Sequence, residues 1–267
     1  MLRLNSSEVP FPTTHVDFPN FGDSFYVMSA SVRRPWEYVY LDSPSEVVYI
    51  AALDIRTRTG SPLQPIAASP TELKCSARVC YSIDIDQACL ISIDPMSGAV
   101  ECLVKYSPSE WVGYEEDSSA FDRQTDTYYA TLLDANNKGQ LIAIDIPSKS
   151  FVRVNGTFAA SASGPYCFEH TSRMLISFGS SLGPIVGLQV DTGAVHVLST
   201  HDMYGLPAGR TLVCDGGELA VQIVAFHEPA SPTYTVTFAL TPDYRAVCTH
   251  NKTTVSWANI AILEPSA

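Results

Sequence analysis

Three polar segments of this chain combine aromatic rings with acids and a few basic groups. The richest is residues 107–117, SPSEWVGYEED; residues 199–210 form the second, and the third contains the pair His227-Glu228. Rings mixed with acids and amides are typical of recognition surfaces for proteins, and they also suit sugars, which stack on rings and bind carboxylates through their hydroxyls. The members predicted to form one binding face are Trp111, Tyr114, Glu115, Glu116, His201, Asp202, Tyr204, Arg210 and His227.

Some of these residues also have a simpler structural interpretation. Trp111 suits the role of an anchor that packs its loop onto the neighbouring strands, and His201 that of a solvated loop residue. The sequence contains no G-x-x-x-x-G-K-S/T phosphate loop, no G-x-S-x-G nucleophile elbow and no H-E-x-x-H zinc helix. We therefore assign no catalytic residue and no metal ligand, and we expect no cofactor.

One acidic position recurs along the chain between two short apolar strands. It is occupied by Asp42, Asp122, Glu169 and Asp215, and a weaker copy of the pattern has Ser76 at the same place. The first interval is 34 residues and the next three are 46, 47 and 46 residues. Because an acid at the entry to a tight turn accepts backbone N–H groups, we interpret this position as structural rather than as a ring of cation ligands.

A second hairpin follows each of the later turns. Residues 89–104, 141–154, 186–198 and 236–250 each read as apolar strand, turn and alternating strand. Each unit therefore supplies four strands in roughly 45 residues, the size of one propeller blade. Over residues 39–263 the chain resembles β-propeller repeat proteins in general, without the Trp-Asp dipeptide or the recurrent glycine pair of particular families. The resemblance implies a fold and leaves the activity open.

The repeat predicts an all-β chain that forms one propeller domain over residues 1–267. Four-stranded blades bury both of their faces only by stacking on one another, and a closed ring leaves no blade exposed. We predict about six four-stranded blades, with five as the alternative. Residues 1–23 are expected to be an extended N-terminal segment, and the strands at 24–32 and 254–264 to close the ring as one composite blade.

Composition limits the class of partner. The formal net charge of −12 at pH 7 would repel a nucleic-acid backbone, so no nucleic acid is expected. Hydrophobic residues make up 46% of the chain and charged residues only 16%, which favours a folded core over a charge-rich disordered chain. No apolar run reaches about 18 residues, so membrane insertion is not expected. The predicted ligand is a protein or a carbohydrate, and the oligomeric state stays open.

Seven cysteines and three sequons bear on the compartment. The cysteines form no C-x-x-C pair, and most lie among strand-forming residues, where we interpret them as small buried hydrophobic side chains. Cys75 and Cys80 could bridge a hairpin in an oxidising compartment. The sequons begin at Asn5, Asn155 and Asn251. The first residues lack the apolar core of a signal peptide, so the chain is expected in the cytoplasm, or outside the cell if it is a mature fragment.

Three functions fit these expectations. The preferred one is a non-enzymatic propeller that recognises a protein or a glycan through the predicted binding face. The second is a propeller hydrolase or lyase with a site at the channel mouth formed by Glu116, His201, Asp202 and His227. The third is a structural subunit of a larger assembly, which exposed apolar side chains around Tyr128-Tyr129 would support.

Overall fold

The structure is a computed structural model, and every regular element in its described part is a β-strand. The described residues are 3–4, 26–33, 36–42, 47–54, 59–76, 79–154, 165–178, 184–199, 210–215, 218–224, 232–255 and 260–261. A membrane-spanning helix, long and apolar enough to cross a bilayer, is not found among these residues. The all-β class predicted from the repeat is confirmed for this part of the chain.

The chain divides into two compact units, each built from more than one segment. The first unit contains Met1–Thr13, Asp117–Gln124 and Arg153–Ala267, and the second contains Thr14–Glu116 and Thr125–Val152. Residues that act together are therefore sought within one unit.

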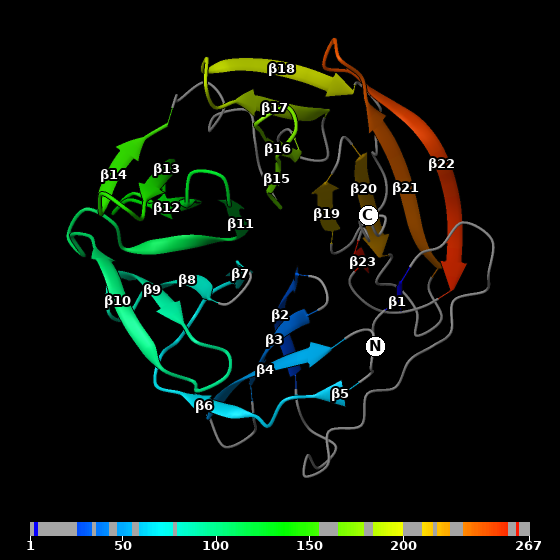
Figure 1. Cartoon of the computed structure of the whole chain (residues 1–267). Coiled ribbons are helices and arrows are strands. Elements are labelled where there is room, and N and C mark those ends of the chain that lie inside the picture. Colours follow the sequence, from blue (N-terminus) through cyan, green and yellow to red (C-terminus); the bar gives the residue numbers. More distant parts are fainter. Residues whose placement is uncertain are drawn as a thin grey trace. The chain divides into compact units, whose positions relative to one another are not determined.

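Two sheets lie entirely in the second unit (Figure 1). The first has the order β2-β3-β4-β5, with β6 also paired to β4; its strands are β2 (Tyr26–Arg33), β3 (Trp36–Asp42), β4 (Val48–Asp54), β5 (Thr59–Gly60) and β6 (Gln64–Ile66). The second has the order β10-β9-β8-β7, with strands β7 (Lys74–Cys75), β8 (Cys80–Asp84), β9 (Cys89–Ile93) and β10 (Val100–Lys105). Neighbouring strands in both sheets are antiparallel.

A third sheet has the order β11-β12-β13-β14, with strands β11 (Gly113–Asp122), β12 (Thr127–Leu133), β13 (Gly139–Asp145) and β14 (Ser150–Arg153). Tyr128 and Tyr129 lie in β12 and are only 0% and 5% exposed. Successive residues of a strand point to opposite faces of its sheet, so the sheet is covered on both faces at this position. The exposed apolar patch that would have supported a structural subunit is therefore not found at these two residues.

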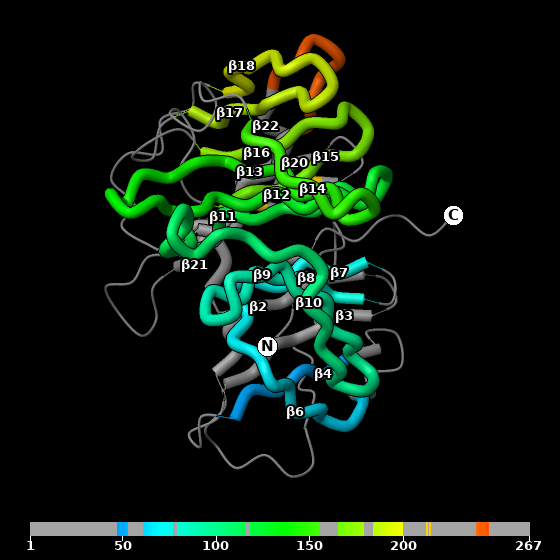
Figure 2. The backbone as a smooth tube through the Cα atoms, turned by 90° about the vertical axis from the view of Figure 1, so that its left-hand side faces the viewer, coloured from blue at the N-terminus to red at the C-terminus, as the bar shows by residue number. Residues whose placement is uncertain are grey.

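The first unit contains two four-stranded antiparallel sheets (Figure 2). One has the order β15-β16-β17-β18, with strands β15 (Cys167–Glu169), β16 (Met174–Phe178), β17 (Ile185–Gln189) and β18 (Ala194–Ser199). The other has the order β19-β20-β21-β22, with strands β19 (Arg210–Asp215), β20 (Glu218–Val224), β21 (Pro232–Leu240) and β22 (Ala246–Val255).

The hairpins predicted from the repeat coincide with observed strand pairs. The recurring acidic position ends β3, β11, β15 and β19, and Ser76 directly follows β7. The second hairpins correspond to β9–β10, β13–β14, β17–β18 and β21–β22. In three sheets the register shifts between the third and fourth strands, at Cys102/Val104, Ile185/Val186 and Thr237/Phe238. A bulge at the same place in three sheets is consistent with copies of one structural unit.

The strands near the two ends of the chain pair differently from the prediction. β2 forms a hairpin with β3 through a two-residue connection, with Arg33 opposite Trp36. β23 (Ile260–Ala261) pairs in parallel with β1 (Arg3–Leu4). Closing a two-residue loop loses less chain entropy than joining distant segments, so the local partner wins for β2. Within the described residues, 24–32 and 254–264 therefore do not share a sheet.

Disulfides join six of the seven cysteines. The bonded pairs are Cys75–Cys80, Cys89–Cys102 and Cys167–Cys214. Cys75 and Cys80 face each other across the β7–β8 ladder, as the hairpin prediction required. The interpretation of most cysteines as free, buried side chains is therefore wrong for Cys89, Cys102, Cys167 and Cys214. All six take part in the apolar clusters of their units, but as bonded pairs. Cys248 lies in β22, and its side chain is outside the described residues.

Candidate functional site

The first part of the predicted binding face is the connection from β10 into β11, which we call the acidic loop (residues 106–115). Two aromatic side chains hold it: Tyr106 is 8% exposed and Trp111 is 6% exposed. The ring of Tyr106 meets Phe151 edge-on at 6.3 Å between centroids, and the backbone N–H of Trp111 donates to the Ser107 carbonyl at 3.0 Å. Between these anchors, residues 107–110 are exposed. The burial of Trp111 favours its interpretation as a loop anchor, because little of its ring is left for a ligand.

Tyr114 lies at the start of β11 and is half-buried. Its hydroxyl donates to Oε2 of Glu72 at 2.7 Å, and Oε1 of Glu72 forms an ion pair with Lys74. The segment just before β7 therefore fixes the phenol end of Tyr114.

Glu115 is the acid of the loop whose surroundings change its chemistry most. Burial raises the pKa of its carboxyl above the ordinary value for Glu. A Cβ placed on Gly139 would lie 3.3 Å from Oε2 of Glu115 and 2.9 Å from Cγ2 of Thr131. The carboxylate is thus packed against the beginning of β13, and the side chain stays half-buried rather than extended into water.

The remaining predicted members fall outside the described side chains. Glu116 lies in β11 and Arg210 begins β19, but only their backbone is described. His201, Asp202, Tyr204 and His227 lie outside the described residues altogether. The structure therefore brings Trp111, Tyr114 and Glu115 together on one connection and leaves the rest of the face a prediction.

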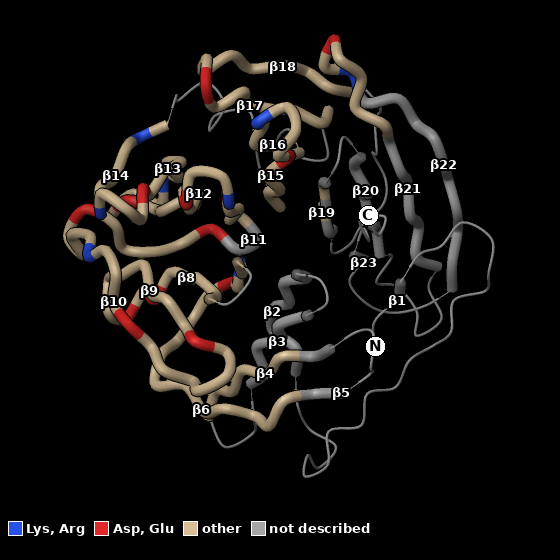
Figure 3. Tube along the Cα trace, viewed as in Figure 1, with Lys and Arg blue, Asp and Glu red and all other residues tan. Residues whose placement is uncertain are grey.

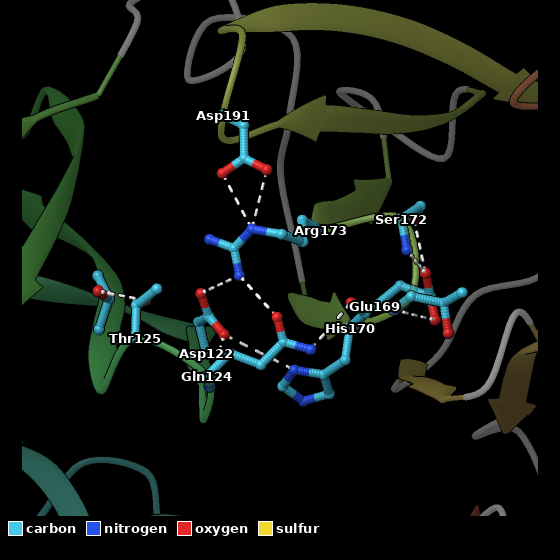
Figure 4. A network of polar contacts seen from close by, with 10 residues as sticks. Asp122, Gln124, Thr125, Glu169, His170, Ser172, Arg173 and Asp191 are labelled. Atoms are coloured by element: carbon cyan, nitrogen blue, oxygen red, sulfur yellow. Dashed lines mark hydrogen bonds and ion pairs between the residues drawn. The ribbon is translucent and has the colours of Figure 1, made fainter.

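A second polar cluster surrounds the turn between β11 and β12 in the first unit (Figure 4). Asp122, which ends β11, is 0% exposed. Its Oδ1 accepts the backbone N–H of Gln124 at 2.9 Å, and its Oδ2 accepts Nη1 of Arg173 at 2.9 Å. The first contact is the turn-fixing bond predicted for the recurring acid. The second is an ion pair to the following sheet, which the repeat pattern did not reveal.

Arg173 sits in the β15–β16 turn and connects three side chains. Its Nε donates to both carboxylate oxygens of Asp191 at 2.9 Å, and its Nη1 also reaches Oε1 of Gln124 at 3.2 Å. Partial desolvation of the guanidinium works against its charge, but the hydrogen bond to Asp191 and the charge of Asp122 outweigh it and raise the pKa of Arg173. The arginine is therefore held as a cation between two acids.

His170 lies beside this cluster with one ring nitrogen shielded from water. Its Nδ1 is 3.7 Å from Oδ1 of Asp122 and has no hydrogen-bond partner in the described part of the chain. The ring also contacts Phe168, at 5.1 Å between centroids. The basic residue within the turn E-H-T-S-R is the sequence signal from which this cluster could have been predicted.

Glu169 occupies the same repeat position as Asp122 and is also 0% exposed. It is satisfied locally: Oε1 accepts the N–H of Thr171 at 3.0 Å, and Oε2 accepts both the N–H and the hydroxyl of Ser172 at 2.6 Å. The structural interpretation of the recurring acid is confirmed at Asp122 and Glu169. The side chains of Asp42 and Asp215 are outside the described residues.

Figure 3 shows where the other acidic residues lie along the chain, and several of them accept hydrogen bonds within turns. Asp94 and Asp134 accept N–H groups of Met96 and Asn136, each at 2.8 Å. Asp84 ends β8 almost fully buried and accepts the N–H of Gln87 at 2.9 Å. In the described part of the chain, no group of three or more His, Cys, Asp or Glu side chains could hold a metal ion.

Comparisons with known proteins identify the fold. No family model matches the chain, and no curated protein matches it. Among solved structures it is similar to TolB from Acinetobacter baumannii, with a TM-score of 0.59 and 12% identity over 87% of this chain and 55% of that chain. The chain thus spans about half the length of that protein.

Two further structures differ in what they bind. A chain of a nidogen–laminin complex has a TM-score of 0.56 and 10% identity, over 84% of this chain and 79% of that one. Oligogalacturonate lyase in complex with manganese has a TM-score of 0.52 and 10% identity, over 80% and 62%. These neighbours are β-propeller proteins, so the chain has a fold of the general β-propeller type, and no specific family is shown.

Proposed function

We propose that this chain is a non-enzymatic binding propeller that recognises a protein or a glycan through an acidic, aromatic loop face. The observation that supports this best is the build of the acidic loop. Buried Tyr106 and Trp111 hold its ends, residues 107–110 are exposed between them, and Tyr114 and Glu115 are half-buried beside them. A loop that is already held in place loses little conformational freedom when it binds, which favours affinity.

The proposed face includes the predicted residues of the later connections. These are Glu116, His201, Asp202, Tyr204, Arg210 and His227. In a four-stranded blade, the connections between successive blades lie at the same end as the turns between second and third strands. The segments that carry these residues would therefore meet the acidic loop at one end of the propeller.

The proposed scaffold is a single propeller domain that includes both compact units. Of the two predicted blade counts, we propose five blades, since five sheets of four or more strands lie among the described residues. A chain of the same general fold occurs in the nidogen–laminin complex, which supports a protein as the ligand.

The loop acids provide the most direct test of this function. Glu110→Gln and Glu115→Gln are compared with Glu101→Gln, a matched control on the exposed side of β10. The probes are a lysine-rich peptide and a panel of neutral oligosaccharides, with binding measured by calorimetry. If a charge contact of about 1 kcal/mol is lost, affinity for the peptide falls roughly five-fold in either loop variant and stays unchanged in the control. Equal affinities in all three variants would remove the acidic loop from the binding face.

The raised pKa of Glu115 adds a pH signature. Because burial favours the neutral form, Glu115 takes up a proton at a higher pH than an ordinary glutamate does. Peptide binding through this carboxylate should therefore weaken as the pH falls through that window. The Glu115→Gln variant should lose this part of the pH dependence, and a profile identical to that of the wild type would argue against a role for Glu115.

The alternative function is a hydrolase or lyase with Glu116, His201, Asp202 and His227 at the channel mouth. The similarity of the fold to a lyase in complex with manganese supports this alternative function. Its test is the thermal unfolding midpoint with and without Mn²⁺, in the wild type and in His201→Ala. A midpoint raised by the metal in the wild type alone would favour the enzyme; the same midpoint in all four measurements would discard this site.

A further inference from the structure

The outermost strand of the last four-stranded sheet is unusually long. β22 (Ala246–Val255) has 10 residues, whereas the corresponding outer strands β10, β14 and β18 have 6, 4 and 6. Within the described residues, β22 has a strand partner on one side only, namely β21. A long unpaired edge is a template for pairing with another chain, and folded proteins normally shorten or cover such edges.

The middle of this edge strand carries a sequon. Asn251-Lys252-Thr253 fits the acceptor pattern for N-linked glycosylation, and Asn251 lies opposite Val236 of β21. Pattern matches of this kind arise often by chance. A second and independent observation is therefore needed to give this one meaning.

The disulfides supply that observation. Three bonds, Cys75–Cys80, Cys89–Cys102 and Cys167–Cys214, are typical of chains that fold in an oxidising compartment. The secretory pathway is one such compartment, and it is also where oligosaccharides are attached to asparagine. A chain that folds there meets the glycosylating enzyme.

We propose that Asn251 is an N-glycosylation site and that its glycan shields the edge of β22 that faces away from β21. In this reaction the side-chain amide nitrogen of Asn251 attacks the anomeric carbon of a polyprenyl-diphosphate oligosaccharide. The bond from that carbon to the diphosphate oxygen breaks, polyprenyl diphosphate leaves with the electron pair, and the amide nitrogen gives up one proton. Thr253 supplies the hydroxyl that the acceptor pattern requires.

The test uses the full chain, directed into the secretory pathway of cultured insect cells. Asn251→Gln and Thr253→Ala remove the sequon, while Thr253→Ser keeps it and serves as the matched control. The glycopeptide that contains residue 251 is measured by mass spectrometry in both the secreted and the cell-associated protein, so a variant that folds poorly still gives an answer. We expect the glycan in the wild type and in Thr253→Ser, and its loss in the other two variants.

Two outcomes contradict the proposal. An unmodified Asn251 peptide in protein whose cysteines are bonded would show that the site is not used. A glycan that is present, but whose removal leaves the elution volume in size-exclusion chromatography unchanged at high protein concentration, would overturn the shielding role. The expected result is a shift of the deglycosylated protein and of Asn251→Gln toward larger species, since both expose the edge.

Discussion

Two junctions in the first unit join consecutive sheets by different chemistry. At one, the disulfide Cys167–Cys214 connects β15 with β19. At the other, the ion pair between Asp122 and Arg173 connects the β11–β12 turn with the β15–β16 turn. Both involve the short segment from Cys167 to Arg173, so one hairpin is tied to its two neighbours, covalently on one side and by charge on the other.

The difference teaches how a repeat can vary its connections without changing its turns. Asp122 and Glu169 fill the same repeat position and both fix their turns, and Asp122 also binds Arg173 of the following hairpin. A buried carboxylate without its cation is costly, whereas a disulfide acts mainly by restricting the unfolded chain. The charged junction should therefore respond to side-chain charge and salt, and the covalent junction to redox conditions.

Removal of the covalent junction should have the largest effect. Cys167 and Cys214 are 47 residues apart in sequence, and chain-entropy arguments give about 4 kcal/mol for closing a loop of that length. The double variant Cys167→Ala/Cys214→Ala should lose roughly that much in the free energy of unfolding, measured by urea denaturation. Cys75→Ala/Cys80→Ala is the control, because its separation of 5 residues predicts only about 2 kcal/mol. Equal losses in the two variants would mean that loop length does not determine how much each disulfide stabilises the fold.

Removal of the cation should come next. Arg173→Met keeps the length of the side chain but leaves Asp122 buried without its charged partner, which should cost about 3 kcal/mol. Arg245→Met is the matched control: Arg245 is 76% exposed in its ion pair with Asp243, so its loss should change stability by at most about 0.5 kcal/mol. Adding Asp122→Asn to Arg173→Met should recover part of the loss. A double variant that is less stable than Arg173→Met alone would contradict the buried-charge explanation.

The sequence was sufficient for the parts of this hairpin that depend on local pattern. Strand, acid, turn and strand recur at nearly constant spacing, so β15, β16 and the role of Glu169 could be predicted from periodicity and turn chemistry. The burial of Trp111 also matches one of the two interpretations that its surroundings allowed. Such features depend on residues close together in the chain.

The contacts that join different hairpins could not be predicted in the same way. Arg173 lies 51 residues from Asp122, and no local pattern specifies that one turn faces the other. The disulfide partner of Cys167 could not be predicted either, since connectivity among several cysteines does not follow from sequence alone. In both cases the deciding quantity was a spatial distance between segments.

A smaller effect is expected when Glu169, whose carboxylate accepts hydrogen bonds from its own turn, is replaced by neutral Gln. Glu169→Gln replaces one acceptor oxygen with an NH₂ group that faces the donors of Thr171 and Ser172. Because buried donors then lose their acceptor, the variant should lose about 2 kcal/mol of unfolding free energy. Glu101→Gln on the exposed edge of β10 should be neutral in the same measurement. If Glu169→Gln is also neutral, the turn does not depend on its acid, and the equivalence with Asp122 fails.

The smallest effect is expected for the contact between Arg173 and Asp191, and it distinguishes this contact from the one between Arg173 and Asp122. Asp191 is 52% exposed and Asp122 is 0% exposed, although both bind Arg173 at 2.9 Å. Solvent and dissolved ions screen the exposed contact, so Asp191→Asn should cost at most about 0.5 kcal/mol in dilute buffer and nothing measurable in 1 M NaCl, where the screening length is about 3 Å. The loss in Arg173→Met should persist in the same salt, because water and ions do not reach Asp122. A loss in Asp191→Asn that survives high salt would mean that both contacts act as buried ones and that the contrast between them is wrong.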